Sequence, residues 1–144
     1  MGIAACRLLF IGSSILLSWL SSPIVLAQEA SGTLEIELNS MTDVSGGCRL
    51  SFVATNSLGD LDKTALEIVE FDSNNLVNQV LVLDFGKLPN NKTRVIQFDV
   101  AHACQSISRL LVNQIAECSG AAIDSNVCLK GLKTANRTTI KFGM

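Results

Sequence analysis

The sequence of 144 residues contains no tyrosine, one tryptophan, two prolines and one histidine. The lone histidine, His102, leaves little material for a zinc site, because such sites are built from several Cys and His ligands. A formal net charge of −2 argues against a basic nucleic-acid binder. No apolar run after Leu26 approaches the roughly 18 residues of a membrane span. The hydrophobic share of 48% argues against disorder, so a small globular domain remains.

The first 27 residues have the three parts of a cleavable signal peptide. Arg7 supplies the positive charge, residues 8–20 supply the apolar region, and Val25 and Ala27 are small residues at the −3 and −1 positions of a peptidase site. We therefore expect cleavage before Gln28, which predicts a periplasmic or secreted protein with no stable membrane insertion. An uncleaved N-terminal anchor is the alternative.

Four of the five cysteines remain when Cys6 is removed with the leader. An even number of cysteines in a short exported chain is typical of disulfides. These four are Cys48, Cys104, Cys118 and Cys128, and no two of them form the CxxC of zinc or thioredoxin-like sites. The spacing predicts disulfides, no metal site and no cofactor.

Residues 33–144 are predicted to form one all-β domain after a polar lead-in at residues 28–32. The segment 107–118 fits both helical spacing and a buried strand, and the surrounding strand signals favour a strand. A loop is expected at 119–126. About seven short strands without alternating helices predict an immunoglobulin-like antiparallel β-sandwich. The expected strands are 33–39, 48–55, 65–71, 79–85, 93–100, 107–118, and finally 129–133 and 138–142 as one bent or two short strands.

Alternation of apolar and polar residues along these strands predicts the core. The side chains expected to be buried are Leu34, Ile36, Leu38, Leu50, Phe52, Val69, Phe71, Leu81, Leu83, Ile96, Phe98 and Leu111.

Two segments, 66–77 (LEIVEFDSNNLV) and 83–98 (LDFGKLPNNKTRVIQF), resemble the middle of small bacterial periplasmic immunoglobulin-like domains of the FxLYD type. Phe71-Asp72 matches the aromatic-Asp pair of that family, whereas Ile68 and Glu70 depart from its Phe and Leu. Most of the chain after the leader also resembles small exported proteins of alphaproteobacteria. The resemblance implies a fold and a compartment, and it implies no activity.

The direction of the strands predicts how the cysteines pair. If successive strands run up and down, Cys48 at the start of the second strand and Cys104 after the fifth lie at one end of the sandwich. Cys118 closes the sixth strand at the opposite end, where Cys128 opens the seventh. Other pairings would span a strand, about 20 Å, whereas disulfides need Cα atoms within about 7 Å. We therefore predict Cys48–Cys104 and Cys118–Cys128, and only the second bridge if 107–118 is a helix.

Catalytic chemistry has few candidates in this sequence. His102 lies two residues from Cys104, so a thiolate–imidazole pair is conceivable, although a loop histidine beside a disulfide is the favoured interpretation. Glu35 and Glu37 share one strand face, which we interpret as a solvated face rather than a glycosidase pair. We predict no catalytic residues.

The sequence favours a non-catalytic exported protein that binds other proteins or assists envelope assembly. Its expected partner is a protein of the cell envelope, whose identity the residues do not specify, and no nucleic acid. Two alternatives belong to other classes: a secreted effector that acts on a host, and a small enzyme that uses His102 with Cys104. Alkylation of Cys104 in the native protein would favour the enzyme.

Overall fold

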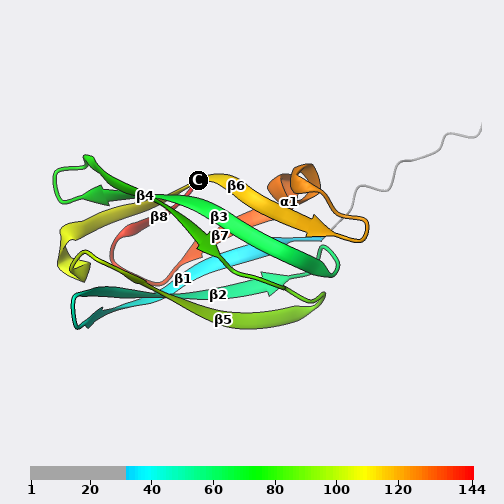
Figure 1. The fold of residues 1–144 in the computed structure, drawn as a ribbon, viewed down its shortest axis with the longest axis horizontal. Coiled ribbons are helices and arrows are strands. Elements are labelled where there is room, and N and C mark those ends of the chain that lie inside the picture. Colours follow the sequence, from blue (N-terminus) through cyan, green and yellow to red (C-terminus); the bar gives the residue numbers. More distant parts are fainter. Residues whose placement is uncertain (1–31) are drawn as a thin grey trace, which may run out of the picture.

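Two four-stranded sheets pack face to face in this computed structural model, which describes residues 32–144 (Figure 1). The first sheet has the order β5-β2-β1-β7, and the second has the order β4-β3-β6-β8. The predicted signal peptide at 1–27 and most of the lead-in lie outside the described residues. The prediction of an all-β sandwich is confirmed, and the immunoglobulin-like class remains a prediction.

Strands make up most of the described chain. In order, the elements are β1 (Leu34–Val44), β2 (Gly47–Asn56), β3 (Leu61–Asp72), β4 (Val77–Asp84), β5 (Lys92–Val100), the 3-10 helix η1 (Cys104–Ser106), β6 (Ile107–Gly120), α1 (Ser125–Gly131), β7 (Leu132–Asn136) and β8 (Lys141–Gly143). The strand interpretation of 107–118 is confirmed by β6.

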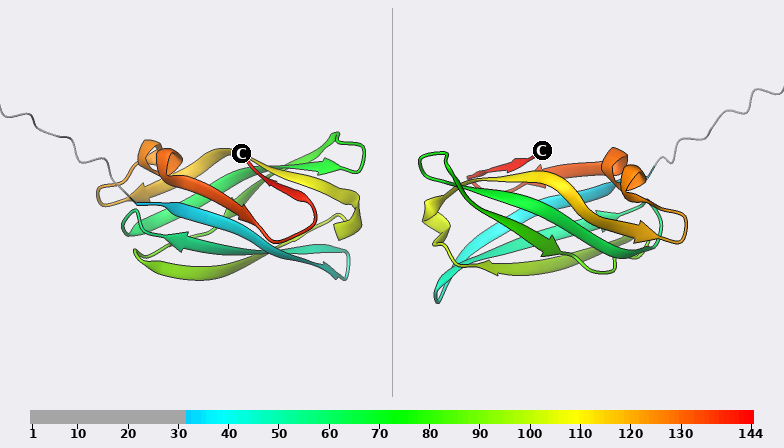
Figure 2. Two further views of the ribbon diagram at one scale, coloured as in Figure 1. Left: turned by 180° about the vertical axis from the view of Figure 1, so that it is seen from behind. Right: turned by 45° about the horizontal axis from the view of Figure 1, so that its top comes forward.

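Neighbouring strands pair antiparallel inside each sheet, and the pairing differs from the expected arrangement at two edges. There β7 runs parallel to β1, and β8 runs parallel to β6. β6 ends at the end of the sandwich where β1 begins, and α1 lies at that same end, so β7 starts beside β1 and runs in the same direction (Figure 2). Leu132, the first residue of β7, therefore pairs with Leu34, the first residue of β1.

The segment around Cys128 was expected as a loop followed by a strand at 129–133, and this expectation is wrong. Residues 125–131 form α1 instead, and β7 begins only at Leu132. Asp124 starts the helix, because its carboxylate accepts hydrogen bonds from the backbone N–H groups of Asn126 and Val127 at 2.9 and 3.0 Å.

The predicted core is confirmed at seven positions: Leu34, Ile36, Leu38, Leu50, Phe52, Val69 and Leu83 are buried. The prediction is wrong at Phe71, Leu81, Ile96, Phe98 and Leu111, which are only partly buried. Leu81, Ile96 and Phe98 lie on the edge strands β4 and β5, where a neighbouring strand is missing on one side. Phe71 and Leu111 face outward from the second sheet, and the guanidinium of Arg109 covers the Phe71 ring at 5.2 Å.

Phe52 is the centre of the core. It is fully buried, and its ring contacts Phe85, Phe98 and Phe142 edge to face at centroid distances of 5.6, 6.0 and 5.6 Å. These partners come from the loop after β4, from β5 and from β8. The cluster therefore joins the two sheets and connects β2 with β8, the last strand.

Candidate functional site: an unprotected sheet edge

Strand β4 forms one edge of the second sheet and carries the largest cluster of exposed aliphatic side chains on one element of the described chain. Val80 and Val82 are 55% and 60% exposed, Val77 at the start of the strand is 60% exposed, and Leu76 just before it is 64% exposed. Leu81 and Leu83 alternate with the two valines and pack against the core. The strand therefore has one buried face and one apolar face in contact with solvent.

The other sheet edges carry basic side chains, whereas β4 does not. Strand β5 contains Lys92 and Arg94, β7 contains Lys133, and β8 contains Lys141, and all four side chains are exposed. Charged residues, above all Lys, are a common means of preventing an edge strand from pairing with another chain. In β4 the only charge is Asp84, at its last position.

Backbone groups on the free side of β4 are available for a further strand. The N–H of Phe85 donates to the carbonyl of Thr64 at 2.8 Å, which fixes the alternation along the β3–β4 ladder. Because N–H and C=O groups of alternate residues point to opposite sides of a strand, those of Val80, Val82 and Asp84 point away from β3. The residues with exposed valine side chains therefore also present unpaired backbone groups.

A buried carboxylate lies directly beneath the start of β4. Glu70 of β3 has a fully buried side chain, and its two oxygens accept hydrogen bonds from Asn78 Nδ2 at 2.9 Å and from Gln79 Nε2 at 2.8 Å. His102, from the loop after β5, places Nδ1 at 2.9 Å from Glu70 Oε1. A bulge between Glu70 and Phe71 shifts the β3–β4 register here, which allows two consecutive β4 side chains to reach one carboxylate.

Burying a charge is costly unless the charge is fully hydrogen-bonded. Because two side chains of β4 supply hydrogen bonds to Glu70, this polar cluster fixes the position of β4. Nδ1 of His102 also lies 3.1 Å from Gln79 Nε2, so this one ring nitrogen contacts both the carboxylate and the amide that donates to it. The cluster was not predicted, and the sequence marked Glu70 only as a departure from the FxLYD pattern. The signal available in the sequence was its spacing: Glu70 follows Leu66 and Ile68 on the same, inward face.

The suggested pairing of His102 with Cys104 is not present. Cys104 is joined to Cys48 with a Cα–Cα distance of 4.8 Å, and the imidazole faces Glu70 instead. Cys104 therefore has no free thiol, which a Cys–His mechanism would need. Cys48 pairs with Val100, the last residue of β5, which explains why Cys104 lies so close to it.

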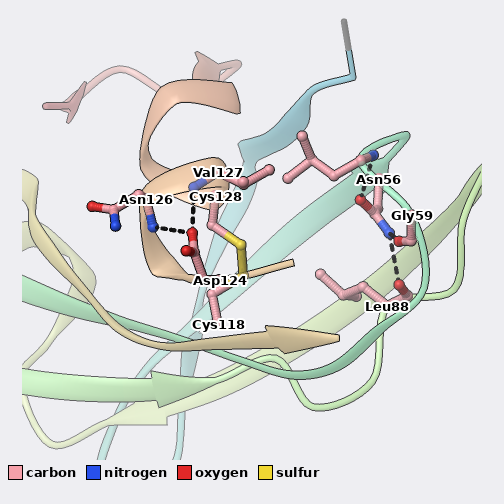
Figure 3. The surroundings of a disulfide bond; sticks show 9 residues. Asn56, Gly59, Leu88, Cys118, Asp124, Asn126, Val127 and Cys128 are labelled. Carbon is pink, nitrogen blue, oxygen red and sulfur yellow. Dashed lines mark hydrogen bonds between the residues drawn. A yellow bond between two sulfur atoms is a disulfide. The ribbon is translucent and has the colours of Figure 1, made fainter. Parts of the chain in front are cut away.

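The second predicted disulfide, Cys118–Cys128, is also present, with Cα atoms 6.4 Å apart (Figure 3). It joins the end of β6 to α1, rather than to the start of a strand as expected. The pairing was correct because the helix lies at the end of the sandwich where the strand was expected to begin. Figure 3 also shows Asn56, a fully buried side chain that donates to the carbonyls of Gly59 and Leu88 at 2.6 and 2.7 Å.

The two carboxylates on one face of β1 do not form a pair. Glu35 is exposed, whereas Glu37 accepts hydrogen bonds from Asn39 Nδ2 at 2.9 Å and from Arg137 Nε at 3.0 Å. These two hydrogen bonds, that from Asn39 first, lower the pKa of Glu37 from its ordinary value. Within residues 32–144 no three His, Cys, Asp or Glu side chains gather closely enough to hold a metal ion.

No family model, curated protein or solved structure matches this chain. Among the described residues, no helix is both long and apolar enough to cross a membrane. The most informative surface is therefore defined by its own chemistry: an edge strand without basic residues, with exposed valines and free backbone groups, held from beneath by the Glu70 cluster.

Proposed function

We propose that this protein is a non-catalytic, exported binding or assembly module that accepts a strand of a partner protein on the free edge of β4. The observation that carries the proposal is the exposure of Val80 and Val82 on an edge strand without basic residues. Strand addition to an open sheet edge gains affinity from main-chain hydrogen bonds and specificity from alternate side chains. Both are available along β4.

Export to the periplasm is the second part of the proposal. All four cysteines after residue 32 are in disulfides, and such bonds persist in oxidising compartments. The leader at residues 1–27 supports the same compartment. N-terminal sequencing of the protein from the envelope fraction tests this part. A mature chain that begins at Gln28 is expected, and a chain that begins at Met1 in the membrane pellet would contradict it.

A capture experiment tests the binding function, and the chain offers a matched control. The full chain is produced with its own leader in three forms: wild type, Val82→Lys on β4, and Val95→Lys on β5. Val82 and Val95 are 60% and 67% exposed and both lie on edge strands, so each substitution places a lysine at an exposed edge. The purified proteins are immobilised and incubated with envelope extract.

Wild type and Val95→Lys are expected to retain the same protein, identified by mass spectrometry, and Val82→Lys is expected to lose it. The physical reason is that a lysine on β4 adds the protection that the other edges already have. Retention of the same proteins by all three forms would refute a binding role for β4. Recovery of the protein from culture supernatant instead of the envelope would favour a secreted effector.

A further inference from the structure

We propose that the strand bound by β4 is β4 of a second copy of this chain, so that the two four-stranded sheets join into one continuous sheet. This inference rests on the proposed binding function and names the partner. A two-fold symmetric contact requires a surface that is complementary to itself. The sequence of β4, from Val77 to Asp84, meets this requirement in an antiparallel register centred on Leu81.

In that register Val80 of each copy lies opposite Val82 of the other. These are also the residues whose N–H and C=O groups point away from β3, so both cross-strand pairs are hydrogen-bonded pairs. Cross-strand pairs of β-branched residues stabilise a sheet. The two most exposed valines of the strand centre would thus cover each other.

The charges of β4 are compatible with this arrangement. Asp84, the only charged residue of the strand, lies opposite Asn78 of the second copy, and the two Asp84 carboxylates are at opposite ends of the contact. A separation of six residues along a strand is about 20 Å, so the like charges do not face each other. The same operation on β5 places Lys92 and Arg94 of each copy in the contact region, which disfavours pairing through that edge.

The closing test is the oligomeric state of the protein purified from the envelope after expression of the full chain. Sedimentation over a wide concentration range is expected to show a dimer for wild type and for Val95→Lys. Val82→Lys is expected to weaken the association by at least about tenfold, because two lysines enter the two-fold contact. A wild type that stays monomeric at every concentration overturns the inference, as does a dimer that Val82→Lys leaves unchanged.

A second variant reports the register. Leu81 lies on the two-fold axis in a pair without mutual hydrogen bonds, so the two Cα atoms are about 4.5 Å apart, inside the ~4.4–6.8 Å range of disulfides. Leu81→Cys is expected to form a disulfide-linked dimer on a non-reducing gel, and Val95→Cys is expected to remain unlinked. Equal linking of both variants, or none, contradicts this register. If wild type is monomeric but captures another envelope protein through β4, self-pairing fails while the binding function stands.

Discussion

The Glu70 cluster makes a quantitative prediction about stability. The perturbation is His102→Ala, which removes the imidazole whose Nδ1 lies 2.9 Å from the buried carboxylate. A hydrogen bond to a charged group contributes about 1.5–3 kcal/mol. Because the His102 side chain is 36% exposed, we expect a loss at the lower end of this range, about 1–2 kcal/mol. Asn78 and Gln79 continue to donate to Glu70.

A second substitution, Glu70→Leu, isolates the interaction. Glu70 lies next to Ile68 on the inward face and opposite Leu110, so a leucine fits an apolar environment, and apolar replacement of buried ions is often neutral or stabilising. His102→Ala is therefore expected to lower the free energy of unfolding by about 1–2 kcal/mol when residue 70 is Glu and by almost nothing when it is Leu. The difference between these two values is the coupling free energy, and it exceeds the ~0.5 kcal/mol scatter seen for independent sites.

The assay is urea denaturation of wild type, both single variants and the double variant, with the disulfides intact. The difference between the two costs of His102→Ala is the coupling free energy. If His102→Ala costs the same in both backgrounds, the contact between Glu70 and His102 contributes nothing to stability. The argument that a compensated buried charge holds β4 in place would then be refuted.

Three further predictions concern the fold. Phe52→Ala is expected to lower the free energy of unfolding by about 3–5 kcal/mol, and Phe98→Ala by less, because Phe52 is fully buried and Phe98 lies on an edge strand; urea melts that show the reverse order would contradict the core assignment. Arg49 donates two hydrogen bonds to Asp99 at 2.7 and 2.8 Å, which lowers the pKa of Asp99. The stabilisation is therefore present above the ordinary Asp pKa and is lost as the pH falls through the lowered value. Arg49→Gln should accordingly have a smaller free energy of unfolding than wild type at neutral pH, and the two free energies should converge in acid. Asp124→Ala should cost about 1 kcal/mol through loss of the cap of α1, measured by thermal unfolding.

Much of the fold could be predicted because each strand carries a local pattern. The alternation of Leu34, Ile36 and Leu38 identifies both the first strand and its buried face. The bridge from Cys48 to Cys104 depends only on strand direction, which successive antiparallel turns determine. The Cys118–Cys128 bridge required only that both residues lie at one end of the sandwich, and this held even though a helix carries Cys128.

The candidate site could not be predicted in the same way, because it depends on which strands lie at the sheet edges. Val80 and Val82 lie in the strand predicted at 79–85, and their exposure follows from the position of β4 at the edge of the sheet, beyond β3. The partners of Glu70 depend on a bulge and on a loop after β5, neither of which leaves a local periodic signal. Contacts between distant segments therefore decide the surface chemistry, while local alternation decides the strands.

Amide hydrogen exchange with and without the bound partner tests the central claim most directly, since it reads the backbone of each edge separately. In the unbound protein the amides of Val80 and Val82 should exchange rapidly, because they point away from β3. In the complex, or in the dimer at high concentration, peptides covering β4 should become protected while those covering β5 stay unchanged. Protection of β5 with no change in β4 would contradict the claim that β4, the edge without basic residues, is the binding surface.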